Sequence, residues 1–307
     1  MSRDTSIAPL PDRGWIRLSG KDALGFLHDQ VSADLESLDE HRVQPGSYCS
    51  PKGRVLAILR VSRRGDALLA ELPAGLVQGI ARRLEMFVLR ADVRIAPAPE
   101  MAAFGVWGDP AAVLEELGLE TPERDFASSR SGDLTAHRMP GAVPRVQVSG
   151  PGGDIEAAWH TSARIAARAD PSHWSALDIA AGWPEVTSAN SDRFLPQSLA
   201  LDDWSALNYR KGCYPGQEVI ARMHYRGQLK RHLYRAEVEG DPPEAGTSIR
   251  AASGAEAGRI VIAAPSPASG RSGMLAVLRD DTAEGSRLAD DGSRPLESPR
   301  RVAPRQQ

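Results

Sequence analysis

The chain has 307 residues, of which 37 are Lys or Arg and 40 are Asp or Glu, so its formal net charge at pH 7 is −3. This balance excludes a protein coated in basic surface for nucleic acid, and any such binding would need a local patch. A chain of this length buries a large core and is expected to divide into two or three lobes. The two cysteines lie far apart in the sequence and form neither a disulfide framework nor a CxxC metal site.

The compartment follows from what the N-terminal segment lacks. Residues 1–12 contain no hydrophobic signal core, and they include Asp4 and Asp12, which transit peptides tend to avoid. No apolar run is long enough to span a bilayer, so we expect no membrane association. We therefore expect a reducing cytoplasm. No pair of histidines or carboxylates has metal-ligand spacing, and we predict no metal site.

The N-terminal half alternates strand and helix patterns. Residues 14–18 predict a strand, and Ser19 with Asp22 then forms a capping-box pattern. The helix that it opens carries its apolar residues on one face, namely Leu24, Leu27, Val31, Leu35 and Leu38. An apolar run at 55–61 predicts a buried strand, with 67–72 as its hairpin partner, and a second amphipathic helix spans 76–88.

The remainder of the chain lacks a regular βαβ order. A strand at 101–106 and a helix at 110–117 closed by Gly118 are predicted, and the mixture indicates an α+β fold. Beyond Arg231 four short runs predict the strands of a small β-barrel or sandwich: 233–238, 247–251, 259–263 and 274–278. The last dozen residues, rich in Arg and Pro, are expected to form a frayed tail.

The stretch Lys211-Gly212-Cys213-Tyr214-Pro215-Gly216-Gln217-Glu218 is the strongest candidate for a functional site. Between Asn208 and Arg235 the only acid is Glu218, against seven basic residues: Arg210, Lys211, Arg222, Arg226, Lys230, Arg231 and Arg235. Nearby cations favour a thiolate, and a thiolate is the nucleophilic form of cysteine. Glycines on both sides allow a positive φ or a close approach to a ligand, as a functional loop requires. The alternative is that Cys213 is only a small buried hydrophobe.

The neighbours of this cysteine leave several roles open. Gln217 and Glu218 could orient a ligand amide or ring nitrogen, or Glu218 could pair with Arg222 one helical turn later. His224 and Tyr225 could form a Cys/His couple with Cys213, but no third orienting residue is evident, so a triad is a weak hypothesis.

The basic run could bind phosphate, the polyglutamate tail of a cofactor, or RNA, with Lys230 and Arg231 as contacts. Interleaved Tyr209, Tyr214 and Tyr225 give it the composition of a single-strand binder, on whose rings bases stack. The alternative is a solvated face paired with acids elsewhere.

An earlier turn could add to this basic surface. Ser50-Pro51-Lys52-Gly53-Arg54 resembles an anion-binding turn, with Lys52 and Arg54 as its cations, but it lacks the spacing of a P-loop. Cys49 beside it is expected to be packed.

The octapeptide resembles the signature K-G-C-Y-x-G-Q-E of the YgfZ proteins, folate-binding relatives of the glycine-cleavage T-protein (aminomethyltransferase). The resemblance covers most of residues 14–235. It includes the stretches Gly20-Lys21-Asp22-Ala23, Pro51-Lys52-Gly53-Arg54, Ala181-Gly182-Trp183-Pro184, Arg193-Phe194-Leu195-Pro196-Gln197 and Arg226-Gly227. It implies a three-lobed cloverleaf around a central channel that binds tetrahydrofolate, with a small C-terminal β-barrel.

The resemblance also suggests domains, contacts and partners. We expect a central α+β domain from 1–45 with 150–230, a second α+β domain from 46–149, and a β-barrel from 231–307. Folate contacts are expected from Arg222, Arg226, Trp183 and Gln197. Cys213 is the expected reactive thiol, in a loop shaped by Lys211, Gly212, Tyr214, Gly216, Gln217 and Glu218. The implied partners are iron–sulfur enzymes or their assembly factors, and through one of them tRNA modification.

Two positions depart from the pattern. Ala57 stands where the T-protein has a catalytic aspartate, so aminomethyl transfer is disfavoured. Ala180 stands where the family commonly has a glutamate suited to a pterin ring, and such a loss weakens recognition by about 1.5–3 kcal/mol. Three hypotheses follow: a folate-binding accessory protein, an RNA- or protein-binding module without chemistry that uses the 208–235 face, and a folate-dependent aminomethyltransferase.

Overall fold

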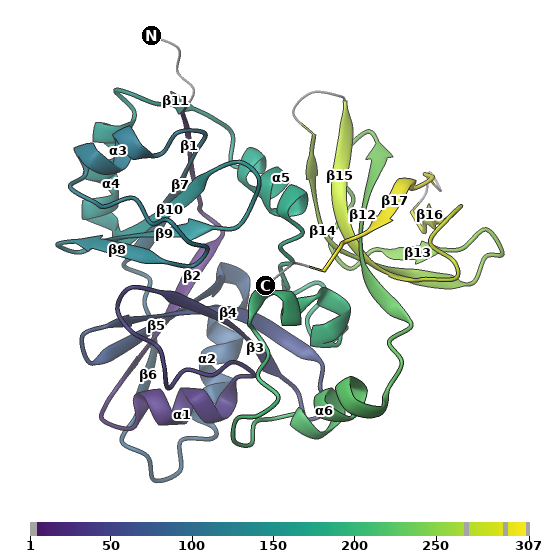
Figure 1. Cartoon of the computed structure of the whole chain (residues 1–307), viewed down its shortest axis with the longest axis horizontal. Coiled ribbons are helices and arrows are strands. Elements are labelled where there is room, and N and C mark those ends of the chain that lie inside the picture. Colours follow the sequence, from purple (N-terminus) through teal and green to yellow (C-terminus); the bar gives the residue numbers. More distant parts are fainter. Residues whose placement is uncertain (1–4, 267–269, 291–293, 305–307) are drawn as a thin grey trace. The chain divides into compact units, whose positions relative to one another are not determined.

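The computed structural model describes residues 5–266, 270–290 and 294–304 (Figure 1). The chain forms two compact units whose segments interleave in the sequence. The first contains the residues up to Leu27, Leu35–Gln44 and Leu59–Leu177, and the second contains His28–Asp34, Pro45–Ile58 and the residues from Asp178 onward. Helices and strands are mixed, which confirms the α+β class. The three expected domain boundaries stay a prediction.

The first unit contains a six-stranded sheet in the order β11-β1-β7-β10-β9-β8. Its strands are β1 (Ser6–Pro9), β7 (Met101–Trp107), β8 (Ser128–Ser131), β9 (Leu134–Met139), β10 (Arg145–Pro151) and β11 (Ala167–Arg168). Phe104, Val106 and Val148 lie in a core that also includes Val113 of α3 (Ala111–Glu116) and Ile155 of α4 (Gly152–Ser162). The predictions of a strand at 101–106 and a helix at 110–117 are confirmed.

A second sheet has the order β3-β4-β5-β2-β6. Its strands are β2 (Arg13–Ser19), β3 (Val43–Cys49), β4 (Val55–Arg64), β5 (Ala67–Pro73) and β6 (Arg94–Pro97), so the strands predicted at 14–18, 55–61 and 67–72 are confirmed. The 3-10 turn η1 (Ala74–Leu76) leads into α2 (Val77–Glu85), which buries Ile80 and Leu84 as its periodicity predicts. The helix ends before Phe87, which is 43% exposed, so the predicted extension to residue 88 was wrong. The chain passes from one unit to the other within β4, after Ile58.

The first predicted helix is shorter than its apolar pattern suggests. It forms α1 (Ala23–Gln30) and ends there, although Val31, Leu35 and Leu38 are all buried. The prediction was therefore right about burial and wrong about helix after Gln30. Val31 instead forms an isolated bridge with Tyr48.

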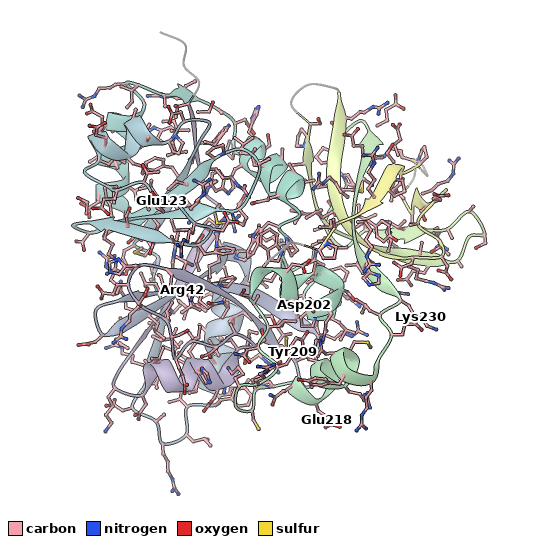
Figure 2. The ribbon with its side chains drawn as sticks, in the orientation of Figure 1. Arg42, Glu123, Asp202, Tyr209, Glu218 and Lys230 are labelled. Atoms are coloured by element: carbon pink, nitrogen blue, oxygen red, sulfur yellow. The ribbon has the colours of Figure 1, made fainter. Side chains whose placement is uncertain are left out.

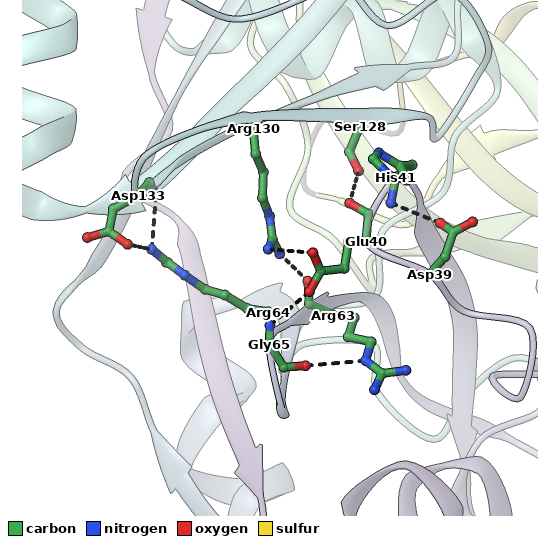
Figure 3. Close-up of polar contacts among 9 residues, drawn as sticks. All are labelled: Asp39, Glu40, His41, Arg63, Arg64, Gly65, Ser128, Arg130 and Asp133. Carbon is green, nitrogen blue, oxygen red and sulfur yellow. Dashed lines mark hydrogen bonds and ion pairs between the residues drawn. The ribbon is translucent and has the colours of Figure 1, made fainter.

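The turn between β4 and β5 is held by ion pairs within the first unit, shown in Figure 3. Arg64 pairs with Asp133, and Arg130 lies 3.8 Å from Glu40. Glu40 Oε1 also accepts the Gly65 N–H at 3.1 Å. Arg64 is thus matched by an acid of the same unit, whereas Arg63 Nε donates to Gly65 O at 3.2 Å.

A buried ionic network within the first unit joins β4 and β5 to β10. Both oxygens of Glu71 on β5 accept from Gln147 Nε2 on β10 at 2.9 Å, and Arg60 on β4 donates to Oε1. Burial alone would raise the pKa of Glu71, but the charge of Arg60 and other neighbours lowers it overall. The fully buried His137 on β9 has its pKa lowered to about 3, first by burial and then by Arg60.

The C-terminal part of the second unit is a curled six-stranded sheet in the order β16-β13-β14-β15-β12-β17 (Figure 1). Its strands are β12 (Arg231–Glu239), β13 (Ser248–Arg250), β14 (Glu256–Pro265), β15 (Arg271–Arg279), β16 (Arg287–Leu288) and β17 (Glu297–Arg301). The four predicted strands are confirmed, and the predicted small β-barrel is this half-barrel. The frayed-tail prediction was wrong for β17, which pairs with β12, and 305–307 lie outside the described residues.

The helical elements of the second unit precede this sheet. They are the last part of α5 (Ser172–Ala181), the 3-10 turns η2 (Pro196–Leu199) and η3 (Leu201–Trp204), and α6 (Gln217–Arg226). The loop that carries the octapeptide of residues 211–218 connects η3 to α6, and we call it the signature loop. Among the described residues, none of the helices is long and apolar enough to cross a membrane.

Candidate functional site

The signature loop begins in a turn built on Asn208. The Asn208 Oδ1 accepts the N–H groups of Arg210 and Lys211 at 2.8 and 3.0 Å, and the Asn208 N–H donates to Ser32 O at 2.8 Å. Side-chain bonds of this kind hold a turn without a regular ladder. Tyr209 and Glu218, labelled in Figure 2, lie just before and at the end of the octapeptide.

Lys211 anchors the loop to the end of α1. Its ammonium donates to the carbonyls of His28, Val31 and Ala33, the last two at 2.8 and 3.0 Å. The last carbonyls of a helix have no intrahelical partner and favour a nearby cation. The sequence suggested that the charge of Lys211 favours the Cys213 thiolate. In the structure the Lys211 ammonium instead donates to carbonyls at and just beyond the C-terminal end of α1.

Two glycines let the loop pack against the Ser50–Arg54 turn. Gly216 has a φ of +81°, and a Cβ there would lie 2.5 Å from Ser50 O and 2.7 Å from Gly53 Cα. Gly53 has a φ of +69°, and its Cβ would lie 2.9 Å from Val219 Cβ on α6. The turns at Gly53 and Gly216, about 160 residues apart in the sequence, therefore pack directly against each other.

The Cys213 thiol is exposed between these anchors. On its far side Gln217 Nε2 donates to the carbonyls of Lys211 and Gly212 at 3.4 Å, which closes the loop across the cysteine. Gly212 has no positive φ and no protein atom within 4 Å of a Cβ position, so a close approach of a ligand at Gly212 stays a prediction. The buried-hydrophobe alternative for Cys213 is wrong as well.

The second cysteine is buried. Cys49 is 1% exposed, its Sγ lies 3.4 Å from Ser47 Oγ, and burial raises its pKa to about 12. This confirms that Cys49 is packed, and the high pKa leaves it a thiol at neutral pH. Tyr214 is also buried, and desolvation raises the pKa of its phenol. Its ring therefore belongs to the support of the loop.

The aromatic residues differ in their availability. Tyr209 stacks on His224 with ring centroids 3.8 Å apart and donates its hydroxyl to Asp202 Oδ2 at 3.1 Å. Tyr225, 64% exposed, packs edge-on against both rings. Of the three tyrosines proposed to stack on bases, Tyr214 is thus buried and Tyr209 is covered on one face. His224 is engaged with Tyr209, and no hydrogen bond joins it to Cys213 among the described residues.

Helix α6 exposes charged side chains to solvent from its first turn to its last. Glu218, Arg222 and Arg226 are all exposed. No ion pair between Glu218 and Arg222 occurs in the described part of the chain, so their pairing is not seen. Glu218 in the first turn and Arg226 in the last have the signs that the helix dipole favours.

Two of the expected folate contacts lie inside the protein. Trp183 is 2% exposed and packs edge-on against Trp204, with ring centroids 5.2 Å apart. Gln197 is 8% exposed, and its Nε2 donates to Ile220 O of α6 at 2.8 Å. Both residues are therefore packed inside the second unit, where they contact η3 and α6 on either side of the loop.

The two departures from the family pattern also have defined surroundings. Ala57 on β4 is completely buried. Ala180 is exposed at the end of α5, and its carbonyl accepts from Arg235 at 2.5 Å. The aspartate and the glutamate that the family pattern has at these two positions are therefore both absent from the second unit.

A cavity of about 690 Å³ lies within the second unit beside the end of α6. Its cations come from four separate segments: Arg54, Arg193, Lys230, Arg231 and Arg259. Two acids, Asp192 and Glu256, also line it. We call it the basic groove. Arg54, Lys230 and Arg231 were predicted as anion contacts, whereas exposed Lys52 is not among the lining residues.

The other two cations were not predicted. Arg193 was noted in the sequence only as part of the family resemblance, and Arg259 stands in an ordinary strand pattern. The fold alone brings Arg259 to the groove, so no local signal could have identified it.

Similarity to known proteins adds to this geometry. No family model matches the chain. The tRNA-modifying protein YgfZ of Yersinia pseudotuberculosis is 32% identical over 233 residues, which cover 75% of this chain and 70% of that protein. The protein of the same name from Yersinia enterocolitica is 31% identical over 295 residues, 93% of this chain and 88% of the other.

The fold matches a solved structure over nearly the whole chain. The glycine cleavage system aminomethyltransferase T from Bartonella henselae superposes with a TM-score of 0.76 at 15% identity, covering 97% of this chain and 85% of that one. At this identity the match shows the fold, and it confirms the predicted T-protein-like architecture. Together with an identity above 30% over most of both sequences, it establishes that the chain belongs to the YgfZ family.

Proposed function

We propose that this protein is an accessory factor in tRNA modification that acts on iron–sulfur enzymes or their assembly factors through the thiol of Cys213. The observation that carries the proposal is an exposed thiol on a loop anchored on both sides. Lys211 ties one side to the end of α1, and Gly216 fits the other against the Ser50–Arg54 turn. A purely structural cysteine does not require exposure. The name shared by the relatives supports the connection to tRNA modification.

The geometry suits contact with a large partner. The open space around Gly212 leaves the adjacent backbone accessible, and α6 adds exposed Arg222 beside the loop. A four-iron cluster needs four ligands, so one thiol cannot hold it alone. Cys213 would therefore supply one sulfur to a cluster whose other ligands belong to the partner.

Tetrahydrofolate is the cofactor that the fold family implies, and its expected contacts do not fit well. A pterin ring needs a hydrogen-bond acceptor, but Ala180 carries a methyl group where a glutamate is expected. Trp183 and Gln197 are buried in the support of the loop. No step is assigned to folate. Calorimetric titration of tetrahydrofolate into the wild type and Ala180→Glu tests binding by itself. Micromolar binding by the wild type would show that another acceptor replaces the glutamate.

The test of the proposed function is complementation. A bacterial strain that lacks its own family member would express the wild type or Cys213→Ser, and modified nucleosides of total tRNA would be measured by mass spectrometry. We expect Cys213→Ser to lose the restored modification while keeping the melting temperature of the wild type, because the side chain is exposed.

Matched controls separate chemistry from folding. Gly212→Ala changes the neighbouring residue without a steric conflict and should keep the melting temperature of the wild type, which controls for the folding of the loop. Cys49→Ala removes the other, buried thiol and should restore modification wherever the protein is stable enough to accumulate. Full rescue by Cys213→Ser would overturn the proposed role of the thiol.

The second candidate is an RNA- or protein-binding module without chemistry. It is favoured by the basic groove together with exposed Arg222, Arg226 and Tyr225 on α6. This reading predicts that Cys213→Ser retains activity and that charge reversal abolishes it. Aminomethyl transfer is the least supported function, because the buried side chain of Ala57 has no ionisable group that could act on a folate amine.

A further inference from the structure

We infer that the basic groove binds the phosphate backbone of RNA; this inference rests on the proposed function in tRNA modification and assigns its partner a place on this chain. The groove is distinct from the expected folate site, because none of the four expected folate contacts lines it and neither does Ala180. Cys213 does not line it either, so the groove and the thiol can be tested separately.

The acids of the groove are already engaged. Glu256 lies 3.5 Å from Arg259 Nε, and Asp192 Oδ1 accepts from Ser50 Oγ at 2.7 Å. Arg259 also donates to Gly246 O at 3.1 Å. Arg259 and Glu256 therefore largely neutralise each other.

The remaining cations are available to a ligand. Arg54 is positioned by a bond from its Nη1 to Arg193 O at 2.5 Å, which brings the two arginines together. Arg193, Lys230 and Arg231 are exposed, and within the described ranges none of the three forms an ion pair. Lys230 lies near Asp281, but that carboxylate is paired with Arg279 at 2.6 Å. The lining thus carries five cations against two acids, of which Glu256 is paired with Arg259 while Asp192 keeps its charge beside a hydroxyl partner.

The groove also contains apolar surface. Phe194, Leu195, Met223, Leu229 and Val277 line it between the cations. A site for nucleic acid combines cations for the backbone with apolar or aromatic surface for sugars and bases. A single phosphate ion would fill only a small part of about 690 Å³. Exposed Arg226 and Tyr225 extend the same chemistry along α6.

The experiment measures binding of a fluorescently labelled tRNA transcript to the full chain by anisotropy, at several salt concentrations. The test variant is Lys230→Glu with Arg231→Glu. The control is Arg82→Glu with Arg90→Glu, which reverses two exposed arginines of the first unit and changes the net charge equally. We expect the groove variant to bind at least about tenfold more weakly, with a salt slope smaller by about 1–2. The control should stay within about twofold of the wild type.

Equal weakening by both variants would mean a global charge effect and would overturn the inference, as would unchanged binding by the groove variant. Tripolyphosphate serves as competitor: if it displaces the transcript as well as an unlabelled RNA of equal total charge does, the groove takes small polyanions and the RNA assignment fails. Matching melting temperatures establish that both variants are folded.

Cys213→Ser separates this inference from the proposed function. It should bind the transcript like the wild type while failing in complementation. If Cys213→Ser complements fully but the groove variant loses RNA, the proposed thiol role fails and the groove stands. If Cys213→Ser fails to complement and the groove variant binds normally, the groove assignment alone is overturned.

Discussion

Gly212 and Gly216 flank the same thiol, yet only one of them is required by the backbone. Gly216 has a φ of +81° and no room for a Cβ, whereas the Gly212 position is open and has no positive φ. A side chain at positive φ costs roughly 1–2 kcal/mol, and overpacking adds about 1–3 kcal/mol. We predict that Gly216→Ala lowers the free energy of unfolding by at least about 2 kcal/mol.

Urea denaturation of Gly216→Ala beside Gly212→Ala checks this prediction. The Gly212 variant is expected to stay within about 0.5 kcal/mol of the wild type, as surface substitutions usually do. Similar losses in both variants would show that the loop is sensitive to any side chain, and the contact between Gly216 and the Ser50–Arg54 turn would not be the cause.

Lys211 offers a second test at the scale of one residue. Replacement by Met keeps most of the aliphatic length but leaves the carbonyls of His28, Val31 and Ala33 without their donor. Hydrogen bonds to a charged group contribute about 1.5–3 kcal/mol, so Lys211→Met should lower the free energy of unfolding by that amount. Hydrogen exchange at the end of α1 should accelerate with it. The control Lys52→Met, at an exposed position, should change neither quantity.

Among the elements, those with strong local patterns could be predicted from the sequence. The hairpin of β4 and β5, helix α2 and four strands of the C-terminal sheet follow their apolar periodicity. The end of α1 could not be predicted, because the apolar spacing continues to Leu38 while the chain turns away after Gln30. The side chain that satisfies that helix end, Lys211, lies about 180 residues later in the sequence. β17 was missed for a similar reason, since its partner β12 is remote in sequence.

The buried network that joins β4 and β5 to β10 predicts a pH dependence. In the native state His137 stays neutral because its pKa is about 3, against an ordinary value of 6.5. Between these values the unfolded chain binds a proton at His137 that the native state does not, so stability falls as the pH falls. We predict a loss of about 1.4 kcal/mol per pH unit from this residue between pH 6 and pH 4. Glu71, whose pKa is lowered, adds a loss of the same sign at still lower pH.

The variant His137→Leu isolates that contribution. Its stability, measured by urea denaturation at a series of pH values, should decline less steeply than that of the wild type over this range. Parallel curves for the two proteins would mean that His137 does not titrate differently in the folded and unfolded states, and the predicted cause would be wrong.

In the molecule as a whole, the sequence pointed to the candidate loop but not to the segments that hold it. The octapeptide pointed to Cys213 directly, since the thiol, the glycines and the charges are adjacent in the chain. Its supports come from His28–Asp34 and Pro45–Ile58, which belong to the same unit although they are far away in sequence. The basic groove likewise collects Arg54, Arg193 and Arg259 from separate segments. Such convergence is a product of the fold and leaves no local pattern.

This interleaving predicts that the loop cannot be ordered by the C-terminal part of the chain alone. A fragment of residues 178–307 retains α6 and the C-terminal sheet with its own core, but it lacks the carbonyls that bind Lys211 and the turn that receives Gly216. In the full chain the Lys211 ammonium is enclosed by those carbonyls and is withheld from trypsin. Losing about 1.5–3 kcal/mol of anchoring should speed cleavage after Lys211 by at least about tenfold.

Cleavage after Arg250 provides the internal reference, because the fragment keeps β14 and β16, with which β13 pairs. Mass spectrometry of timed digests would give both rates in each protein. The prediction requires acceleration after Lys211 relative to Arg250. Equal protection of Lys211 in the fragment and the full chain would show that the loop orders itself, and the anchoring by the N-terminal segments would then not be what exposes Cys213 in a fixed position.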